Sequence, residues 1–179
     1  LRVQNIVRFL MLLDSDQVFL DSGTTCSEMV PYLKKMHDVT VLTNSARLAL
    51  QLNAPGLSVF LIGGEYRPDR MDTVGPMAIS ALNQVRGYVA FIGADGLSMD
   101  FGPSASDVAS AHLHRIVIEN AREAVLLVDS SKFGGASLFQ IVDWSRISKV
   151  VTDREPDKKW KQFFDEKHII LFYPEQADN

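Results

Sequence analysis

Apolar residues recur along the chain in short continuous runs of strand length. The runs lie at 17–20, 39–42, 57–62, 87–92, 124–128, 148–151 and 168–172. Most of them do not alternate apolar with polar residues, which is typical of strands buried on both faces of a sheet. The pattern therefore predicts a sheet that is covered on both sides.

Between these runs, the residue pattern is compatible with helices. The predicted helices cover 24–36, 45–53, 74–85, 104–122 and 157–166. Strands and helices that alternate in this way predict an α/β fold, with a mainly parallel sheet and helices on both faces. No repeat, low-complexity segment or linker interrupts the pattern, so we expect a single domain over residues 1–179.

Composition and charge narrow the functional classes. The 46% hydrophobic and 22% charged residues are ordinary for a soluble globular protein, and the net charge of −4 gives no bulk attraction to DNA. The longest uncharged run near the N-terminus, 9–13, is far shorter than the roughly 20 residues that span a membrane. Cys26 is the only cysteine, which excludes an internal disulfide. We therefore expect a cytoplasmic protein without membrane contact.

Polar and glycine residues gather after the predicted strands. In an open α/β sheet, ligands bind beyond the carboxyl ends of the strands, so these turns are the candidate site. The candidate binding residues, taken turn by turn, are Asp21, Ser22, Gly23, Thr24 and Thr25; Thr43, Asn44 and Ser45; Gly63 and Gly64; Gly93, Ala94, Asp95 and Gly96; and Lys132.

Each of these turns has two interpretations. Any α/β protein uses Gly, Asp, Ser and Thr to pass from strand to helix, so a single turn can be purely structural. Five such turns at one edge, together with the charge of Lys132, favour a small polar or phosphorylated ligand. Asp21, Asp95 and Asp129 could converge there, either for acid–base chemistry or to bind sugar hydroxyls, and we favour the second role.

Catalytic and metal-binding patterns are missing from the sequence. It contains neither a Walker loop nor a Gly-x-Ser-x-Gly elbow. Cys26 stands near a predicted helix start, but no histidine can be placed beside it from the sequence. His112 and His114 are two residues apart on a predicted helix and so face different sides. We predict no catalytic residue, metal or cofactor, and we expect His114 at the surface.

Five motifs in order, FLDSGTT, VLTNS, LIGGEYRPDRMDTVGPMA, FIGADGLS and VDSSKFG, resemble the C-terminal effector-sensing domain of the DeoR family of bacterial sugar-operon repressors. The resemblance covers residues 6 to 172. It implies a fold similar to ribose-5-phosphate isomerase and the coenzyme A transferases. It also implies a homo-oligomer whose operator DNA is bound by an N-terminal winged helix-turn-helix that is absent from this chain. The start without Met, inside a helical pattern, agrees with this expectation.

The resemblance also assigns roles within the candidate site. The phosphate-binding turn of the isomerase resembles 22–25, its aspartate-rich loop resembles 93–96, and its later lysine resembles Lys132. The lysine- and glutamate-bearing segment that the isomerase needs for catalysis has no counterpart, since no glutamate lies between Glu65 and Glu119. A phosphate-binding site that lacks the catalytic glutamate indicates a sensor of a phosphorylated sugar.

This chain departs from the repressors over 103–115. Pro103-Ser104-Ala105 stands where they usually have Thr-Thr, and Ala109-Ser110-Ala111 with His114-Arg115 stands where they have an acidic stretch and Lys-Arg. The effector could therefore differ from the family norm. Two further hypotheses stay open at this point: an isomerase-like enzyme, and a module whose main task is oligomerisation.

Overall fold

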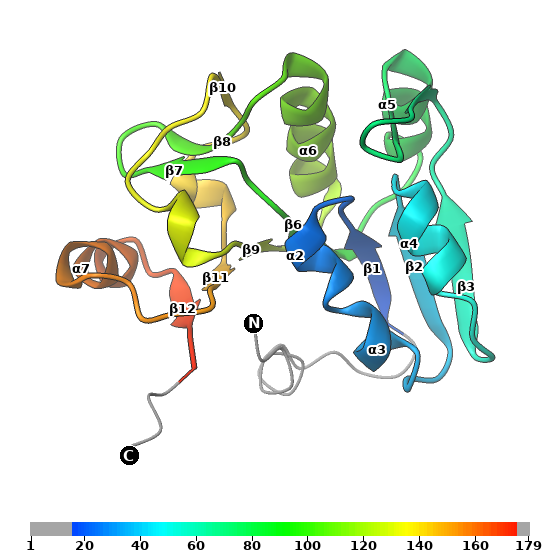
Figure 1. Ribbon diagram of the computed structural model, residues 1–179, viewed down its shortest axis with the longest axis horizontal. Helices are drawn as coiled ribbons and strands as arrows, with labels where there is room; N and C mark the ends of the chain where they lie inside the picture. The colour runs from blue at the N-terminus through cyan, green and yellow to red at the C-terminus, as the bar shows by residue number, and fades with distance from the viewer. Residues whose placement is uncertain (1–15, 175–179) are drawn as a thin grey trace.

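The computed structural model describes residues 16–174, and its centre is a seven-stranded sheet in which every neighbouring pair of strands runs parallel (Figure 1). The strand order is β12-β11-β9-β6-β1-β2-β3. The bounds are β1 Gln17–Leu20, β2 Val39–Thr43, β3 Leu57–Leu61, β6 Val89–Ile92, β9 Glu123–Leu127, β11 Lys149–Val151 and β12 Ile170–Phe172. Each predicted apolar run holds one of these strands, so the prediction of a mainly parallel sheet is confirmed.

Helices cover both faces of the sheet, as the sequence predicts. They are α2 Thr24–Ser27, α3 Val30–Leu33, α4 Ala46–Gln51, α5 Pro76–Leu82, α6 Val108–Asn120 and α7 Lys158–Glu166. Side chains of a strand alternate between faces, so β1 contributes to two cores. Phe19 packs in the core that holds α5, α6 and α7, whereas Val18 and Leu20 pack in the core that holds α2, α3 and α4.

The predicted helix over 24–36 is wrong. It is two one-turn helices, α2 and α3, with Glu28 and Met29 between them. Pro31 explains the break, because proline has no amide hydrogen to continue the helix and is well placed only in a first turn. The predicted helix over 104–122 begins later, at Val108, where the Asp107 side chain accepts a hydrogen bond from the Ser110 amide.

Two small antiparallel sheets were not predicted. One is formed by β7 Gly96–Ser98, β8 Gly102–Ala105 and β10 Phe139–Gln140, and the other is the hairpin of β4 Glu65–Arg67 and β5 Asp72–Val74. The hairpin packs on the end of β2, where the Ala46 amide donates to Met71 and the Thr73 amide to Asn44. It thus covers part of the edge at which the parallel strands end.

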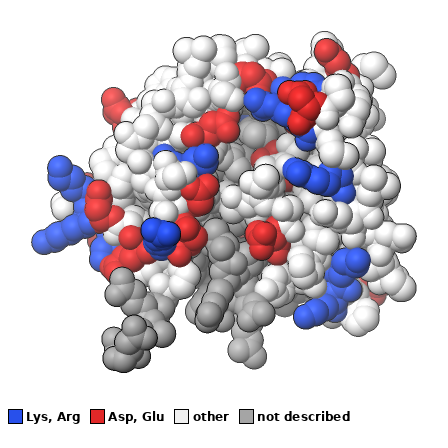
Figure 2. Space-filling model, viewed as in Figure 1, with Lys and Arg blue, Asp and Glu red and all other residues white. Residues whose placement is uncertain are grey.

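No helix within residues 16–174 has the length and apolar character needed to cross a membrane. The apolar run at 9–13 lies outside the described residues. On the face shown in Figure 2, acidic and basic side chains are interspersed over the surface.

Candidate functional site

A cavity of about 190 Å³ opens at the carboxyl ends of β1, β6 and β9. Loops after these strands, the α6 helix and the tip of the β4–β5 hairpin line it. The predicted residues that it brings together are Asp21, Ser22, Gly23, Thr24, Thr25, Gly93, Ala94, Asp95 and Lys132. The remaining polar groups on its walls are Arg70, Ser110, His114 and Asp129.

A buried ion pair lies at the floor of the cavity. His114 Nε2 is 2.8 Å from Asp21 Oδ1, and the other carboxylate oxygen accepts a hydrogen bond from the Gly93 amide. Burial alone would lower the pKa of His114, but the charges of Asp21, Asp95 and Asp107 outweigh it and raise the pKa above 6.5. Burial would raise the pKa of Asp21, and the His114 charge together with the hydrogen bonds lowers it instead. Each partner therefore favours the charged form of the other.

The location of His114 corrects a sequence-based expectation. We expected a surface histidine, but the residue is only 8% exposed and lines the cavity. Ser110 and His114 lie one turn apart on α6 and so share the face that meets the cavity. This spacing is the signal in the sequence that could have found both residues. Arg70 offers no such signal, because the hairpin that carries it was not predicted.

Lys132 ends a tight turn, η1 (Ser130–Lys132), directly after β9. Asp129 holds the turn by accepting a hydrogen bond from the Ser131 amide, and hydrogen bonds from Ser131 lower the pKa of this carboxyl. Phe133 then packs edge-on against Trp160, with ring centroids 5.2 Å apart. Lys132 lines the cavity, and its ammonium forms no hydrogen bond or ion pair with the residues that the structure describes. Its charge acts on Asp129, where it helps to lower the pKa of the carboxyl.

A network of ion pairs joins the β4–β5 hairpin to the start of α6, on the side of the cavity away from Lys132. Two nitrogens of Arg67 donate to Asp72, at 2.8 and 2.7 Å, and a third lies 2.9 Å from Asp107. The hydrogen bonds from Arg67 to Asp72 raise the pKa of the guanidinium further, and Asp72 is buried. Arg70, next to this network, is the hairpin residue that reaches the cavity.

Three predicted residues at the end of β2, Thr43, Asn44 and Ser45, do not line the cavity. They are buried by the hairpin, where Asn44 donates to the Thr73 carbonyl and Thr43 Oγ1 accepts from the Ser45 amide. Ser45 also caps α4 by accepting from the Leu48 amide. These contacts serve the fold, whereas Asn44 Oδ1 is buried without a hydrogen-bond partner among the described residues.

Three predicted glycines, Gly63, Gly64 and Gly96, also lie away from the cavity walls. At Gly64, with φ of 155°, a Cβ would come within 2.5 Å of the Val74 carbonyl, and at Gly96 it would come within 2.1 Å of the Gly135 carbonyl. Both residues therefore permit close backbone packing. At Gly63 a Cβ would meet nothing within 4 Å.

The described residues offer little for metal binding or covalent catalysis. No group of three or more His, Cys, Asp or Glu within 16–174 could hold a metal ion. Cys26 is buried and its thiol points to the Phe91 carbonyl, and burial raises its pKa well above 9.0. Its thiolate is therefore scarce at neutral pH.

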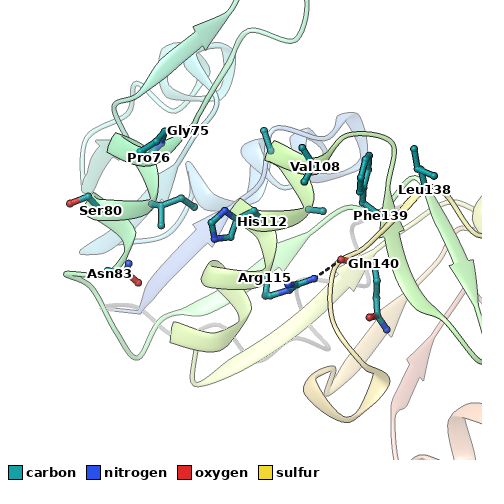
Figure 3. Close-up of a pocket in the computed structure, with 13 residues that line it drawn as sticks. Gly75, Pro76, Ser80, Asn83, Val108, His112, Arg115, Leu138, Phe139 and Gln140 are labelled. Atoms are coloured by element: carbon teal, nitrogen blue, oxygen red, sulfur yellow. Dashed lines mark hydrogen bonds between the residues drawn. The ribbon is translucent and has the colours of Figure 1, made fainter.

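A larger groove, of about 790 Å³, runs between α5, α6 and β10 (Figure 3). Its walls are mostly apolar, and Arg115 at its base donates to the carbonyls of Ile141 and Gln140. Because this guanidinium is already engaged, the groove lacks the convergent donors of the smaller cavity. The smaller cavity gathers more charged and polar side chains than this groove.

The fold of the chain has a solved counterpart in an isomerase. A solved structure of D-ribose-5-phosphate isomerase in complex with phospho-erythronic acid matches with a TM-score of 0.51 at 16% identity, over 74% of this chain and 52% of that one. At this identity the likeness shows the fold alone, and it confirms the expected fold of the ribose-5-phosphate isomerase type.

The family follows from the sequence. Residues 9–154 match the DeoR C-terminal sensor domain, and the chain belongs to this family. It is 31% identical over 157 residues to the HTH-type transcriptional regulator IolR of Bacillus subtilis (strain 168), which covers 87% of this chain and 62% of that protein. It is 30% identical over 166 residues to the HTH-type transcriptional repressor GlcR of the same organism, with 92% and 64% covered.

The chain thus spans less than two thirds of the length of these relatives. Membership of this family confirms the prediction of a DeoR-type sensor domain.

Proposed function

We propose that this domain binds a phosphorylated sugar in the cavity at the carboxyl ends of β1, β6 and β9. The observation that carries the proposal is that Lys132 lines the same cavity as Ser22, Thr24 and Thr25, and that its ammonium has no hydrogen bond or ion pair among the described residues. A phosphate accepts hydrogen bonds from hydroxyls and backbone amides and gains further from a nearby cation. The glycines at 23 and 93 let the backbone approach the ligand closely.

The sugar itself would lie between Lys132 and Asp95. Asp95 accepts a hydrogen bond from the Ser106 amide through Oδ2, which leaves its other oxygen to accept from a sugar hydroxyl. No glutamate lines this cavity among the described residues, which supports binding without isomerisation. Ligand binding would shift the population of regulator conformations. This shift would change operator binding by an N-terminal winged helix, with a coupling free energy of about 1–3 kcal/mol. We place this regulator in the cytoplasm.

A variant of Lys132 tests the phosphate site. Wild-type protein should be stabilised against thermal unfolding by at least one member of a panel of triose, pentose and hexose phosphates. Lys132→Met should weaken this binding about tenfold or more, because a charge-assisted hydrogen bond to the phosphate is lost. Binding is measured by thermal shift and calorimetry.

The exposed Lys34, at the end of α3, gives the control. Lys34→Met should bind the same phosphate as tightly as the wild type. Failure of every phosphosugar to bind, or equal binding by Lys132→Met, would reject the site.

We propose in addition that the domain forms homo-oligomers through the groove between α5, α6 and β10. Two large apolar side chains on its walls are exposed, Val108 at 62% and Leu138 at 74%, and Met77 on α5 is 74% exposed. An apolar rim around an apolar groove suits a second copy of the same surface.

Sedimentation measures the assembly. Wild-type protein should sediment as a dimer or larger species, and Leu138→Glu should reduce it to a monomer, because the charge would have to be buried at the interface. Leu50, 77% exposed on α4, provides the control Leu50→Glu, which should keep the assembly. A monomeric wild type would contradict the proposal.

A further inference from the structure

The cavity has a cation at each of two opposite rims. Lys132 follows β9, and the Arg70 hairpin is bonded to the residues after β2. Two strands, β6 and β1, lie between β9 and β2 in the sheet. Three strand spacings of about 4.8 Å separate the two anchoring points by about 14 Å. Lys132 and Arg70 therefore approach the cavity from its two sides.

Arg70 is held by one ion pair and two longer hydrogen bonds, and part of its side chain is exposed. Its Nη1 lies 2.8 Å from Asp107 Oδ2, yet this buried oxygen has no hydrogen-bond partner among the described residues. Its remaining contacts are two serine hydroxyls, Ser106 at 3.2 Å and Ser110 at 3.4 Å, and its side chain is 41% exposed.

Asp107 does not depend on Arg70. Its Oδ1 lies 2.9 Å from Arg67 Nη1 and accepts from the Ser110 amide, also at 2.9 Å. Arg70 can therefore turn to a ligand without leaving Asp107 as an unpaired charge, which would otherwise be the largest cost of such a movement.

His114, next to this rim, has a hydrogen-bonding atom without a partner. Its Nδ1 is buried and has no partner among the described residues, although the residue lines the cavity. With Nε2 paired to Asp21, a protonated ring has Nδ1–H left to donate. Ser110, one turn away on α6, accepts from Arg67 at 2.9 Å and lies 3.4 Å from Arg70. Arg70, Ser110 and His114 all line this cavity.

The carboxylates around the cavity already accept hydrogen bonds from other protein groups. Asp21 accepts from Gly93 and pairs with His114, Asp95 accepts from the Ser106 amide, and Asp129 accepts from Ser131. Each of these carboxylates accepts a hydrogen bond from the protein. Among the described residues, Lys132 has only the nearby charge of Asp129, Arg70 has an ion pair with Asp107 that is not a hydrogen bond, and His114 Nδ1 has no partner.

We propose that the ligand of this cavity carries two anionic groups, with a phosphate at the Lys132 rim and a second phosphate or a carboxylate at the rim formed by Arg70, Ser110 and His114. The proposal rests on the proposed function and narrows it to sugar bisphosphates and phosphorylated sugar acids. A sugar monophosphate would fill the first rim and leave the second unsatisfied.

Matched pairs of ligands test the second anion by calorimetry on the purified chain. Glucose 6-phosphate is compared with 6-phosphogluconate, fructose 6-phosphate with fructose 1,6-bisphosphate, and ribose 5-phosphate with ribose 1,5-bisphosphate. In at least one pair, the ligand with two anionic groups should bind about tenfold or more tightly than the ligand with one phosphate, because it gains a charge-assisted hydrogen bond. Preference for the acid or for the bisphosphates distinguishes the two sources of the second anion.

Variants of Arg70 locate the effect. Arg70→Gln should weaken binding of the ligand with two anionic groups about tenfold more than binding of its monophosphate partner, and Arg70→Lys should restore part of this difference. Arg86, which is exposed and precedes β6 at the opposite end of the strands, provides the control Arg86→Gln, which should behave like the wild type.

The outcomes separate this proposal from the proposed function. Binding of monophosphates that depends on Lys132, with no gain from a second anion, overturns this proposal alone. An equal loss for both members of a pair in Arg70→Gln overturns it as well. Absence of binding by every ligand in the set rejects both proposals together.

Discussion

Replacing His114 with alanine is expected to lower the free energy of unfolding by about 3 kcal/mol near pH 6, the lower end of the range for removing one partner of a buried ion pair. Asp21 is 3% exposed, and His114 is its cationic partner at 2.8 Å. The lone carboxylate can take up a proton instead of staying charged, which keeps the cost at this lower end. Denaturant unfolding at several pH values measures the effect.

The pH dependence carries the signature of the pair. His114 has a folded-state pKa above 6.5, so its contribution is full below pH 6.5 and is lost as the pH rises through that folded-state value. Asp21 has a folded-state pKa below 3.8, so its contribution is present above pH 3.8 and is lost as the pH falls through the folded-state value. The difference in the free energy of unfolding between wild type and His114→Ala should therefore be largest between about pH 3.8 and pH 6.5. It should become smaller at lower and at higher pH.

The exposed His112 on the same helix gives a matched control. His112 also lines the groove proposed as the oligomer interface, so His112→Ala is measured in the Leu138→Glu background, where it should stay within about 0.5 kcal/mol of its parent. If His114→Ala behaves like His112→Ala, or if its effect does not change with pH, the buried pair does not contribute as described.

Replacing Gly96 with alanine is expected to cost about 3 kcal/mol, the upper end of the usual range for overpacking. The added Cβ would lie 2.1 Å from the Gly135 carbonyl oxygen and 2.8 Å from the Ser137 amide nitrogen. Both contacts are backbone atoms, so no side chain can rotate away to relieve them. The segment after Lys132 would have to shift. Thermal and denaturant unfolding measure the loss.

Gly135, on the other side of this contact, gives the matched control. A Cβ there would meet nothing within 4 Å, and its φ is not in the left-handed region. Gly135→Ala should therefore be neutral or stabilise the protein slightly, by up to about 1 kcal/mol, through a less flexible unfolded chain. Equal effects of the two substitutions would contradict the close approach at Gly96.

The central sheet could be predicted because its signal is local. Each apolar run is continuous, and burial on both faces of a parallel sheet requires this pattern. The short antiparallel strands could not be predicted in the same way, since two to four residues are too few to show a period. The error over 24–36 was avoidable, because Pro31 lies in the middle of that predicted helix.

The candidate site could be predicted only where the strand ends remain open. The turns after β1, β6 and β9 meet at the cavity, as the general rule for α/β sheets requires. The turn after β2 fails the rule because the β4–β5 hairpin covers Asn44 and Ser45, a contact between distant residues that no local pattern reveals. The burial of His114 likewise depends on how α6 packs over Asp21.

The cavity walls come from the loop after β1, the hairpin tip, the loop after β6, the α6 helix and the turn after β9. A molecule that fills the space between them ties these separate segments together, and its binding free energy is added to the stability of the folded state. At a concentration one hundred times its dissociation constant, the gain is about 2.7 kcal/mol. Unfolded chains are the ones that proteases remove, so such a gain lengthens the lifetime of the protein. The amount of regulator in a cell, and not only its state, would then follow the level of its metabolite.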